Sequence, residues 1–264
     1  MKSIKQFLIP WASACLALTV VTSKAETVHI AHCQQVCPEQ SDTANELVVR
    51  HLYAASINPE WGLAEWVAYR VVDGGVGIAS LLPRYWEPDA LMRSSIDIDL
   101  DGGEGPRVVR PDLSNAQDSE YRTSEFLFNP EDRGRLAPMT SFGGTPYWQE
   151  LNNLSNMAPI PPALRIGSWS RLEQAINRLA EQADLYVLAG PLPDSNGEVT
   201  AYYKVVRDNT AQAAFIFDTG LAEHVNFCEQ SSSLAVIEQQ LSLSLFPALQ
   251  LDNSLLADLG CGNP

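Results

Sequence analysis

The cysteines of this chain restrict its fold more than any other sequence feature. Four of the five cysteines lie beyond the first 25 residues, which read as a removable export signal. An even number of cysteines in an exported protein is typical of disulfides, which join distant segments covalently. A disulfide to the cysteine nearest the C-terminus would close a long loop and hold that terminus. It would raise the free energy of unfolding by on the order of a few kcal/mol. A zinc site that includes His32 would need further ligands at metal spacing, which the sequence does not supply. We therefore expect two disulfides among Cys33, Cys37, Cys228 and Cys261.

The first 25 residues have the features of an export signal that is removed from the mature protein. Lys2 and Lys5 form a basic start, residues 7–21 are mostly apolar, and Ser23-Lys24-Ala25 suits a signal peptidase. The apolar stretch is too short and too interrupted for a membrane span, so we expect no stable membrane insertion. We predict a signal peptide at 1–25 and export to the periplasm or the extracellular space.

The 239 residues that remain, 26–264, suit a single domain with a sizeable core. Loss of the three leader lysines lowers the basic residues from 17 to 14 against 32 acidic residues, so the mature chain carries a net charge of −18. A chain this acidic repels polyanions at long range, and non-specific nucleic-acid binding depends on phosphate neutralisation. We therefore expect at most weak binding of DNA or RNA, unless a groove is locally basic.

Hydrophobic patterns predict an α+β domain. Apolar residues such as Trp169 and Leu172 recur at helical spacing and predict an amphipathic helix over 168–183. A second helix is expected over 234–245, ended by Pro247. Because strands and helices do not alternate regularly, an α+β arrangement is expected. Runs rich in β-branched and aromatic residues predict buried strands at 66–72, 186–192, 202–206 and 214–217.

Residues 131–138 read Glu-Asp-Arg-Gly-Arg-Leu-Ala-Pro. They resemble the Asp-Arg-Gly-His signature of the non-specific DNA/RNA endonucleases of the Serratia nuclease type. Three matching residues alone recur by chance, so the surrounding pattern carries the resemblance, which runs from Cys33 to Cys261. The matching segments are Arg50–Tyr53 and Glu65–Tyr69 in the family's first strands, Arg84–Trp86, Leu154–Pro159, Gly167–Glu173 and Gly190–Leu192.

The resemblance implies a fold, a disulfide pattern and a chemistry. The implied fold is a central, mainly antiparallel sheet flanked by helices, with a ββα-metal site. The implied disulfides are Cys33–Cys37 and Cys228–Cys261. In the family, the signature histidine activates a water, one asparagine holds Mg²⁺, and a downstream glutamate orients the waters on the metal. Arginines stabilise the charge on the phosphoryl group, because a phosphodiester resists attack until that charge is neutralised.

Two positions of this chain depart from the family pattern. Arg135 stands at the histidine position, and a guanidinium stays protonated, so it cannot accept a proton from water. Arg165 stands at the asparagine position, where a cation would repel Mg²⁺. We therefore expect no bound metal and cleavage slower by at least roughly 10³-fold. Glu173 is retained, and we expect an Arg165–Glu173 ion pair in place of the metal; the alternative is that both arginines point to solvent.

Three further site residues have a family role and a structural alternative. Arg84 would aid the leaving group, or pair with Glu87 or Asp89. Asn156 would contact the site, or cap the turn that follows it. Arg133 would bind a phosphate. The histidines lie away from the base position in the sequence, at His29, His32, His51 and His224.

Residues 94–125 form an acidic insertion relative to the family. Asp97–Gly102 has the opening of a calcium loop, but Val108 stands where the closing acid belongs. We therefore interpret this stretch as a solvated acidic loop.

These features support three hypotheses of function. The leading one is an exported family member that has lost catalysis and retains at most binding to nucleic acid or to a protein partner. The first alternative is an active Mg²⁺-dependent DNA/RNA endonuclease with a rearranged base. The second is an exported interaction protein that contacts an unidentified partner through the acidic insertion.

Overall fold

The computed structural model describes most of the domain predicted for residues 26–264. The described residues are 30–39, 41–59, 63–80, 82–92, 134–194, 196–247 and 251–262. The predicted signal peptide, the acidic insertion, Arg133 and His29 lie outside these ranges.

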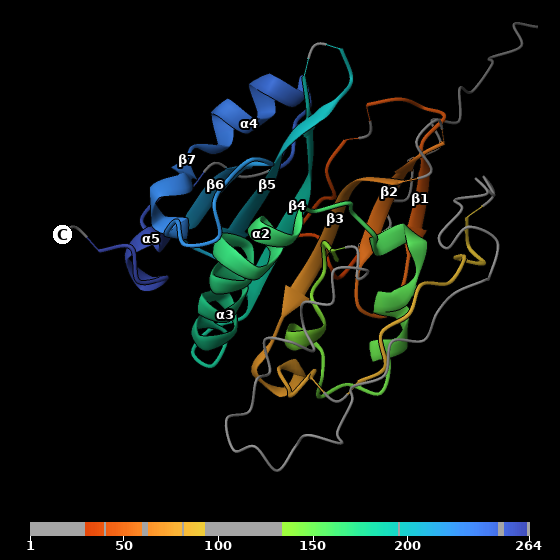
Figure 1. The fold of residues 1–264 in the computed structure, drawn as a ribbon, viewed down its shortest axis with the longest axis horizontal. Coiled ribbons are helices and arrows are strands. Elements are labelled where there is room, and N and C mark those ends of the chain that lie inside the picture. The colour runs from red at the N-terminus through yellow and green to blue at the C-terminus, as the bar shows by residue number, and fades with distance from the viewer. Residues whose placement is uncertain are drawn as a thin grey trace, which may run out of the picture.

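The described residues form a seven-stranded antiparallel sheet in which each strand pairs with the next one in the chain (Figure 1). The strands are β1 (Glu46–Val49), β2 (Ala54–Asn58), β3 (Leu63–Val71), β4 (Leu185–Pro193), β5 (Val199–Arg207), β6 (Gln212–Asp218) and β7 (Ser231–Ser232). The predicted α+β class and antiparallel sheet are therefore confirmed.

The strands divide their side chains between two cores, one on each face of the sheet. Tyr202 packs into the larger core and Tyr203 into the smaller one, because successive residues of a strand point to opposite faces. The predicted strands correspond to β3, β4, β5 and β6. Arg50–Tyr53, matched to the first strands of the family, instead connect β1 to β2, and the Arg50 amide donates to the Tyr53 carbonyl at 2.8 Å.

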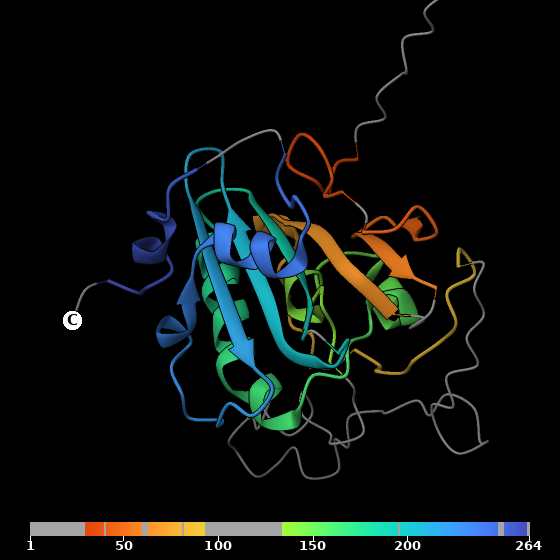
Figure 2. The ribbon, with the colours of Figure 1, turned by 90° about the horizontal axis from the view of Figure 1, so that it is seen from above.

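Helices lie on both faces of the sheet (Figure 2). Leu172 of α3 packs into the larger core, and Ile237 of α4 packs into the smaller one. The helix α4 ends at Leu241 and not at residue 245 as predicted, because Ser242 takes a left-handed φ of 52° that stops it. The helices are α2 (Pro162–Leu164), α3 (Ser170–Leu179), α4 (Leu234–Leu241) and α5 (Leu255–Asp258).

The helix predicted over 168–183 is shorter in the structure. Its first residues belong to a wide turn, η5 (Arg165–Trp169), and α3 begins only after it. Gly167 in this turn has a ψ of −120°, which is not helical. A Cβ atom at Gly167 would lie 2.5 Å from the carbonyl oxygen of Glu223. The close approach of that backbone therefore needs glycine and accounts for the break.

The long connection from β3 to β4 carries α2, η5 and α3 together with several further turns. The matched segments Leu154–Pro159 and Gly167–Glu173 lie in this connection. The turns of this connection are η1 (Asp73–Gly75), η2 (Met139–Ser141), η3 (Trp148–Asn152) and η4 (Leu154–Asn156), and η6 (Phe227–Gln230) follows β6.

Two disulfides join cysteines of the described ranges. Cys33 is bonded to Cys37, and Cys228 of η6 is bonded to Cys261 beyond α5. This is the pairing that the resemblance implies, and the second bond holds the C-terminal segment against the sheet. None of the helices in the described ranges is long and apolar enough to cross a membrane.

Candidate functional site

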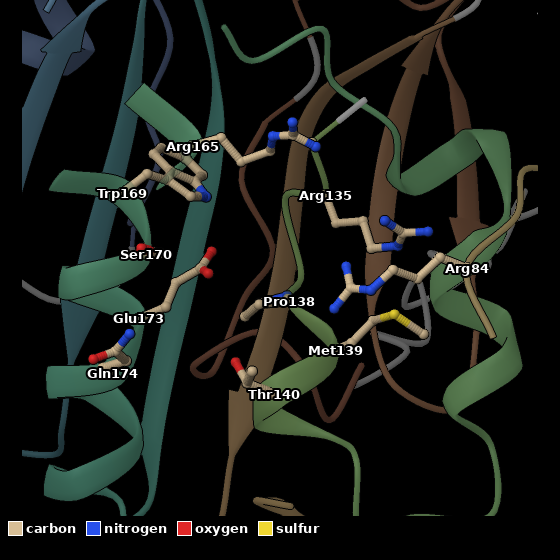
Figure 3. A pocket seen from close by; sticks show the side chains of 11 residues that line it. Arg84, Arg135, Pro138, Met139, Thr140, Arg165, Trp169, Ser170, Glu173 and Gln174 are labelled. Carbon is tan, nitrogen blue, oxygen red and sulfur yellow. The ribbon is translucent and has the colours of Figure 1, made fainter. Parts of the chain in front are cut away.

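A pocket lies between α3 and the segment that follows Gly134. Its described lining includes Arg84, Arg135, Arg165 and Glu173. In Figure 3, Glu173 enters the pocket from α3, Arg84 and Arg135 lie on the opposite side, and Arg165 reaches across from η5. The fold thus brings together four of the residues singled out in the sequence, over a separation of 89 positions from Arg84 to Glu173 (173 − 84).

Backbone pairing sets the position of Arg135. Arg135 and Met157 form an antiparallel bridge, and the Ala158 amide donates to the Gly134 carbonyl at 3.0 Å. A Cβ atom at Gly134 would lie 2.8 Å from the side chain of Ile160. Gly134 is therefore needed for close packing, and it delivers the next side chain to the pocket.

Arg135 is buried, with 6% of its surface exposed. Its Nη2 donates to Asn152 Oδ1 at 2.7 Å and to the Tyr85 carbonyl at 3.4 Å. The guanidinium also stacks over the ring of Trp86, 4.2 Å from the centroid. These contacts hold a permanent cation in the wall of the pocket.

Asn156 has a structural role instead of a place in the pocket lining. It is fully buried, and its Oδ1 accepts from the Ala137 amide at 2.8 Å. Its Nδ2 donates to the carbonyls of Ala137 at 3.0 Å and Leu151 at 3.1 Å. The predicted cap on the following turn is therefore wrong, because the side chain bonds back to segments that precede it. It joins η3 to the strand-like segment that carries Arg135.

Glu173 is paired with Lys204 on β5. The Nζ of Lys204 lies 2.8 Å from Glu173 Oε1 and 3.9 Å from the centroid of the Trp169 ring. Burial raises the pKa of Glu173, while the ammonium of Lys204 and a hydrogen bond from Trp169 oppose that rise. Burial likewise lowers the pKa of Lys204, and Glu173 opposes that change. The pair thus compensates two charges that the fold removes from water.

The structure corrects the expected Arg165–Glu173 ion pair. Among the ion pairs of the described residues, the partner of Glu173 is Lys204. The alternative that both arginines point to solvent is also wrong, because Arg135 and Arg165 are 6% and 7% exposed. Lys204 was missed by the sequence reasoning, although a single lysine within the apolar run of β5 is a signal of a buried charge.

Arg84 faces the pocket and is buried. Its charge lowers the pKa of Glu173, although less than Lys204 does. Asp89 was one of the two acids expected as an alternative partner of Arg84. It pairs with Arg50 and accepts a hydrogen bond from Ser155. Arg84 and Arg135 lie on the same side of the pocket (Figure 3).

The histidines of the described ranges do not line the pocket. His51 stacks on Tyr147 with ring centroids 4.1 Å apart, and its Nδ1 lies 2.7 Å from Glu150 Oε1. The Nε2 of His32 contacts the Arg50 carbonyl at 2.8 Å. The part of the pocket lining that the structure describes therefore offers no imidazole as a general base.

The described lining does not suit a magnesium ion. Mg²⁺ prefers oxygen ligands, and the carboxylate available in this lining, Glu173, is paired with Lys204. Arg84, Arg135 and Arg165 would repel a dication. Within the described ranges, no three His, Cys, Asp or Glu side chains gather as a metal site would require. The described lining thus holds three guanidinium groups and one carboxylate.

The antiparallel sheet, the helix that carries Glu173 and the arginine-lined pocket beside it define a protein with a ββα-metal nuclease fold. The sequence profile of the DNA/RNA non-specific endonucleases matches residues 32–250, and the chain belongs to this family. A nuclease of Serratia marcescens is 27% identical over 260 residues, which cover 91% of this chain and 90% of that protein.

A solved structure shows the same fold. The matched chain comes from the crystal structure of the EndoG/EndoGI complex, which concerns the inhibition of EndoG. It superimposes with a TM-score of 0.52 at 19% identity, and the match covers 79% of this chain and 90% of that chain. At this identity the likeness supports the fold alone.

Proposed function

We propose that this chain is an exported, non-hydrolysing member of the endonuclease family that binds phosphate groups in its arginine pocket without a metal. The observation that carries the proposal is the state of Arg135. Its guanidinium is buried, bonded to Asn152 and stacked on Trp86, so it has little freedom to leave the position of the base.

Two physical arguments support the loss of hydrolysis. A guanidinium does not release its proton at physiological pH, so Arg135 cannot activate a water, and the loss of a general base costs roughly 10²–10⁴-fold in rate. Arg165 adds a second cation where the family places a metal ligand, which disfavours the metal-bound water that would serve as nucleophile. Both losses act on the activation of the water that would attack phosphorus.

Binding is supported by the chemistry of the groups that remain. Arg84, Arg135 and Arg165 line one pocket, and guanidinium groups bind phosphate oxygens through paired, charge-assisted hydrogen bonds. The high net negative charge of the chain repels polyanions at long range, so we expect phosphate binding at the pocket and not along the rest of the surface.

Export is supported by two observations. The first 25 residues have the pattern of a signal peptide. The disulfides Cys33–Cys37 and Cys228–Cys261 suit an oxidising environment, as found outside the cytosol. The destination, periplasm or extracellular space, would follow from fractionation of the producing cells.

Plasmid nicking tests the proposed loss of activity. Homogeneous protein is incubated with supercoiled plasmid and with RNA, in Mg²⁺ and separately in EDTA. We expect cleavage at least roughly 10³-fold slower than that of an intact family member. Robust Mg²⁺-dependent degradation of both substrates would overturn the proposal and favour the alternative of an active enzyme with a rearranged base.

A further inference from the structure

We propose that the open edge of β1 is a docking site for an extended, basic segment of a different protein, which adds to the sheet as a further strand. β1 lies at one margin of the sheet (Figure 1). The described ranges supply it with one strand partner, β2. The described lining of the arginine pocket includes no residue of β1, so the proposal does not depend on the ligand of that pocket.

The backbone register shows which groups of β1 face the open edge. The Arg50 amide donates to the Tyr53 carbonyl at 2.8 Å, so these residues form a hydrogen-bonded pair at the end of the β1–β2 hairpin. Hydrogen-bonded and non-hydrogen-bonded pairs alternate along an antiparallel ladder, and β1 keeps one register with β2 over its whole length. The N–H and C=O groups of Leu47 and Val49 therefore point away from β2. Within the described ranges, no other backbone group bonds to them.

The side chains of β1 leave apolar surface beside those backbone groups. Val48 is buried in the larger core, whereas Leu47 and Val49 are 46% and 44% exposed on the opposite face. Proteins commonly protect an edge strand with lysine, with proline or by keeping it very short. The other margin of the sheet is short and polar, since β7 consists of Ser231 and Ser232, but β1 has none of these protections. An added strand would cover both apolar side chains and pair the outward backbone groups.

An exposed aromatic pair extends this surface beyond the C-terminal end of β1. The ring of His51 stacks on that of Tyr147, with centroids 4.1 Å apart and an interplanar angle of 3°. Glu150 holds His51 through its amide at 2.8 Å and its Nδ1 at 2.7 Å, so the pair is fixed although both rings are exposed. A fixed aromatic surface beside a carboxylate suits the side chain of an arginine or a lysine.

The charge of the chain favours a basic partner. The formal net charge is −15, from 17 basic and 32 acidic residues. This charge attracts a cationic segment, and it repels both nucleic acid and a second copy of the chain. Alternate side chains of a strand face the same side. The edge of β1 therefore suits a segment in which apolar residues alternate with basic ones.

Two short labelled peptides test the chemistry of the partner. Valine alternates with lysine in one and with glutamate in the other, and fluorescence anisotropy gives their affinities for the folded protein. We expect the lysine peptide to bind on the order of tenfold tighter or more. Its binding should slow hydrogen exchange at the amides of Leu47 and Val49, measured by NMR. Equal or absent binding of the two peptides, or unchanged exchange at those amides, would overturn the proposal.

Two variants and a matched control locate the site. Val49→Pro removes an N–H that points away from β2, so it spares the β1–β2 ladder and should weaken binding of the lysine peptide by on the order of tenfold. Leu47→Ser should weaken it as well, because apolar surface is lost. Val236→Ser removes an apolar side chain that is 40% exposed on α4 and should leave the affinity unchanged.

Urea unfolding shows whether each variant folds. If Val49→Pro does not fold, Leu47→Ser decides alone, and an unchanged affinity in the deciding variant would contradict the proposal. Sedimentation then separates a second copy from a different protein. We expect the chain to be monomeric at the concentrations of the titration. A dimer that Val49→Pro dissociates would assign the edge to a second copy and overturn the assignment to a basic partner.

Discussion

Replacement of Lys204 by methionine should destabilise the protein strongly. Lys204 is fully buried, the side chain of Glu173 is 12% exposed, and the two charged atoms lie 2.8 Å apart. Lys204→Met keeps much of the volume but leaves a buried carboxylate without its main partner. Breaking a buried pair on one side costs about 3–5 kcal/mol. Loss of the cation–π contact with Trp169 adds about 0.5–2 kcal/mol, partly offset by sulfur–aromatic packing.

A double-mutant cycle isolates the ion pair from its surroundings. Urea unfolding gives the free energy of unfolding for Lys204→Met, Glu173→Gln and the double variant. The double variant should be more stable than the sum of the single losses predicts, by on the order of 1–3 kcal/mol, because it leaves no unpaired buried charge. The slope of each unfolding curve must stay constant for the comparison to hold.

An exposed ion pair provides the matched control. Arg70 lies on β3 and forms an ion pair with Asp184, which directly precedes β4. The two side chains are 40% and 47% exposed. Arg70→Met should therefore change the free energy of unfolding by less than about 1 kcal/mol. If Lys204→Met cost no more than Arg70→Met, then Lys204 would not be the group that compensates Glu173.

Two further predictions concern catalysis and pH. The double variant Arg135→His, Arg165→Asn should restore measurable Mg²⁺-dependent plasmid nicking, whereas each single variant should do little, because groups that act as one catalytic unit are not additive; equal activity in Arg135→His and the double variant would show that Arg165 does not block the metal. Burial lowers the pKa of His32, although its hydrogen bond to the Arg50 carbonyl opposes this. The unfolded chain therefore takes up the proton first as the pH falls, so the stability from His32 is complete above its ordinary pKa of 6.5 and is lost as the pH falls through the lower, folded value. His32→Gln should flatten the urea-unfolding free energy between about pH 7.5 and 5; an unchanged pH profile would contradict this assignment.

Local patterns in the sequence determined the larger part of the fold. Runs rich in β-branched and aromatic residues predicted β3 to β6, because a strand that is buried on both faces of its sheet carries such residues at consecutive positions. The linear order of the motif also predicted that Arg135 and Arg165 depart from the family pattern. Their permanent charge is a property of the residue type and needs no structure to be known.

Contacts between distant segments decided what the local patterns could not. The break before α3 depends on the backbone at Glu223, which packs against Gly167 from a position far along the chain. The amide of Asn156 bonds to Ala137, nineteen positions away, which removed it from the pocket.

The partner of Glu173 was decided in the same way. Helical spacing placed Glu173 on α3, and a run of β-branched and aromatic residues placed Lys204 on β5, but neither pattern contains the distance between the two side chains. Glu173 and Lys204 are thirty-one positions apart in the sequence. The distance between their side chains depends on how α3 packs across the sheet. Desolvation makes the charged pair necessary once both side chains are buried together, and only the tertiary structure brings them together.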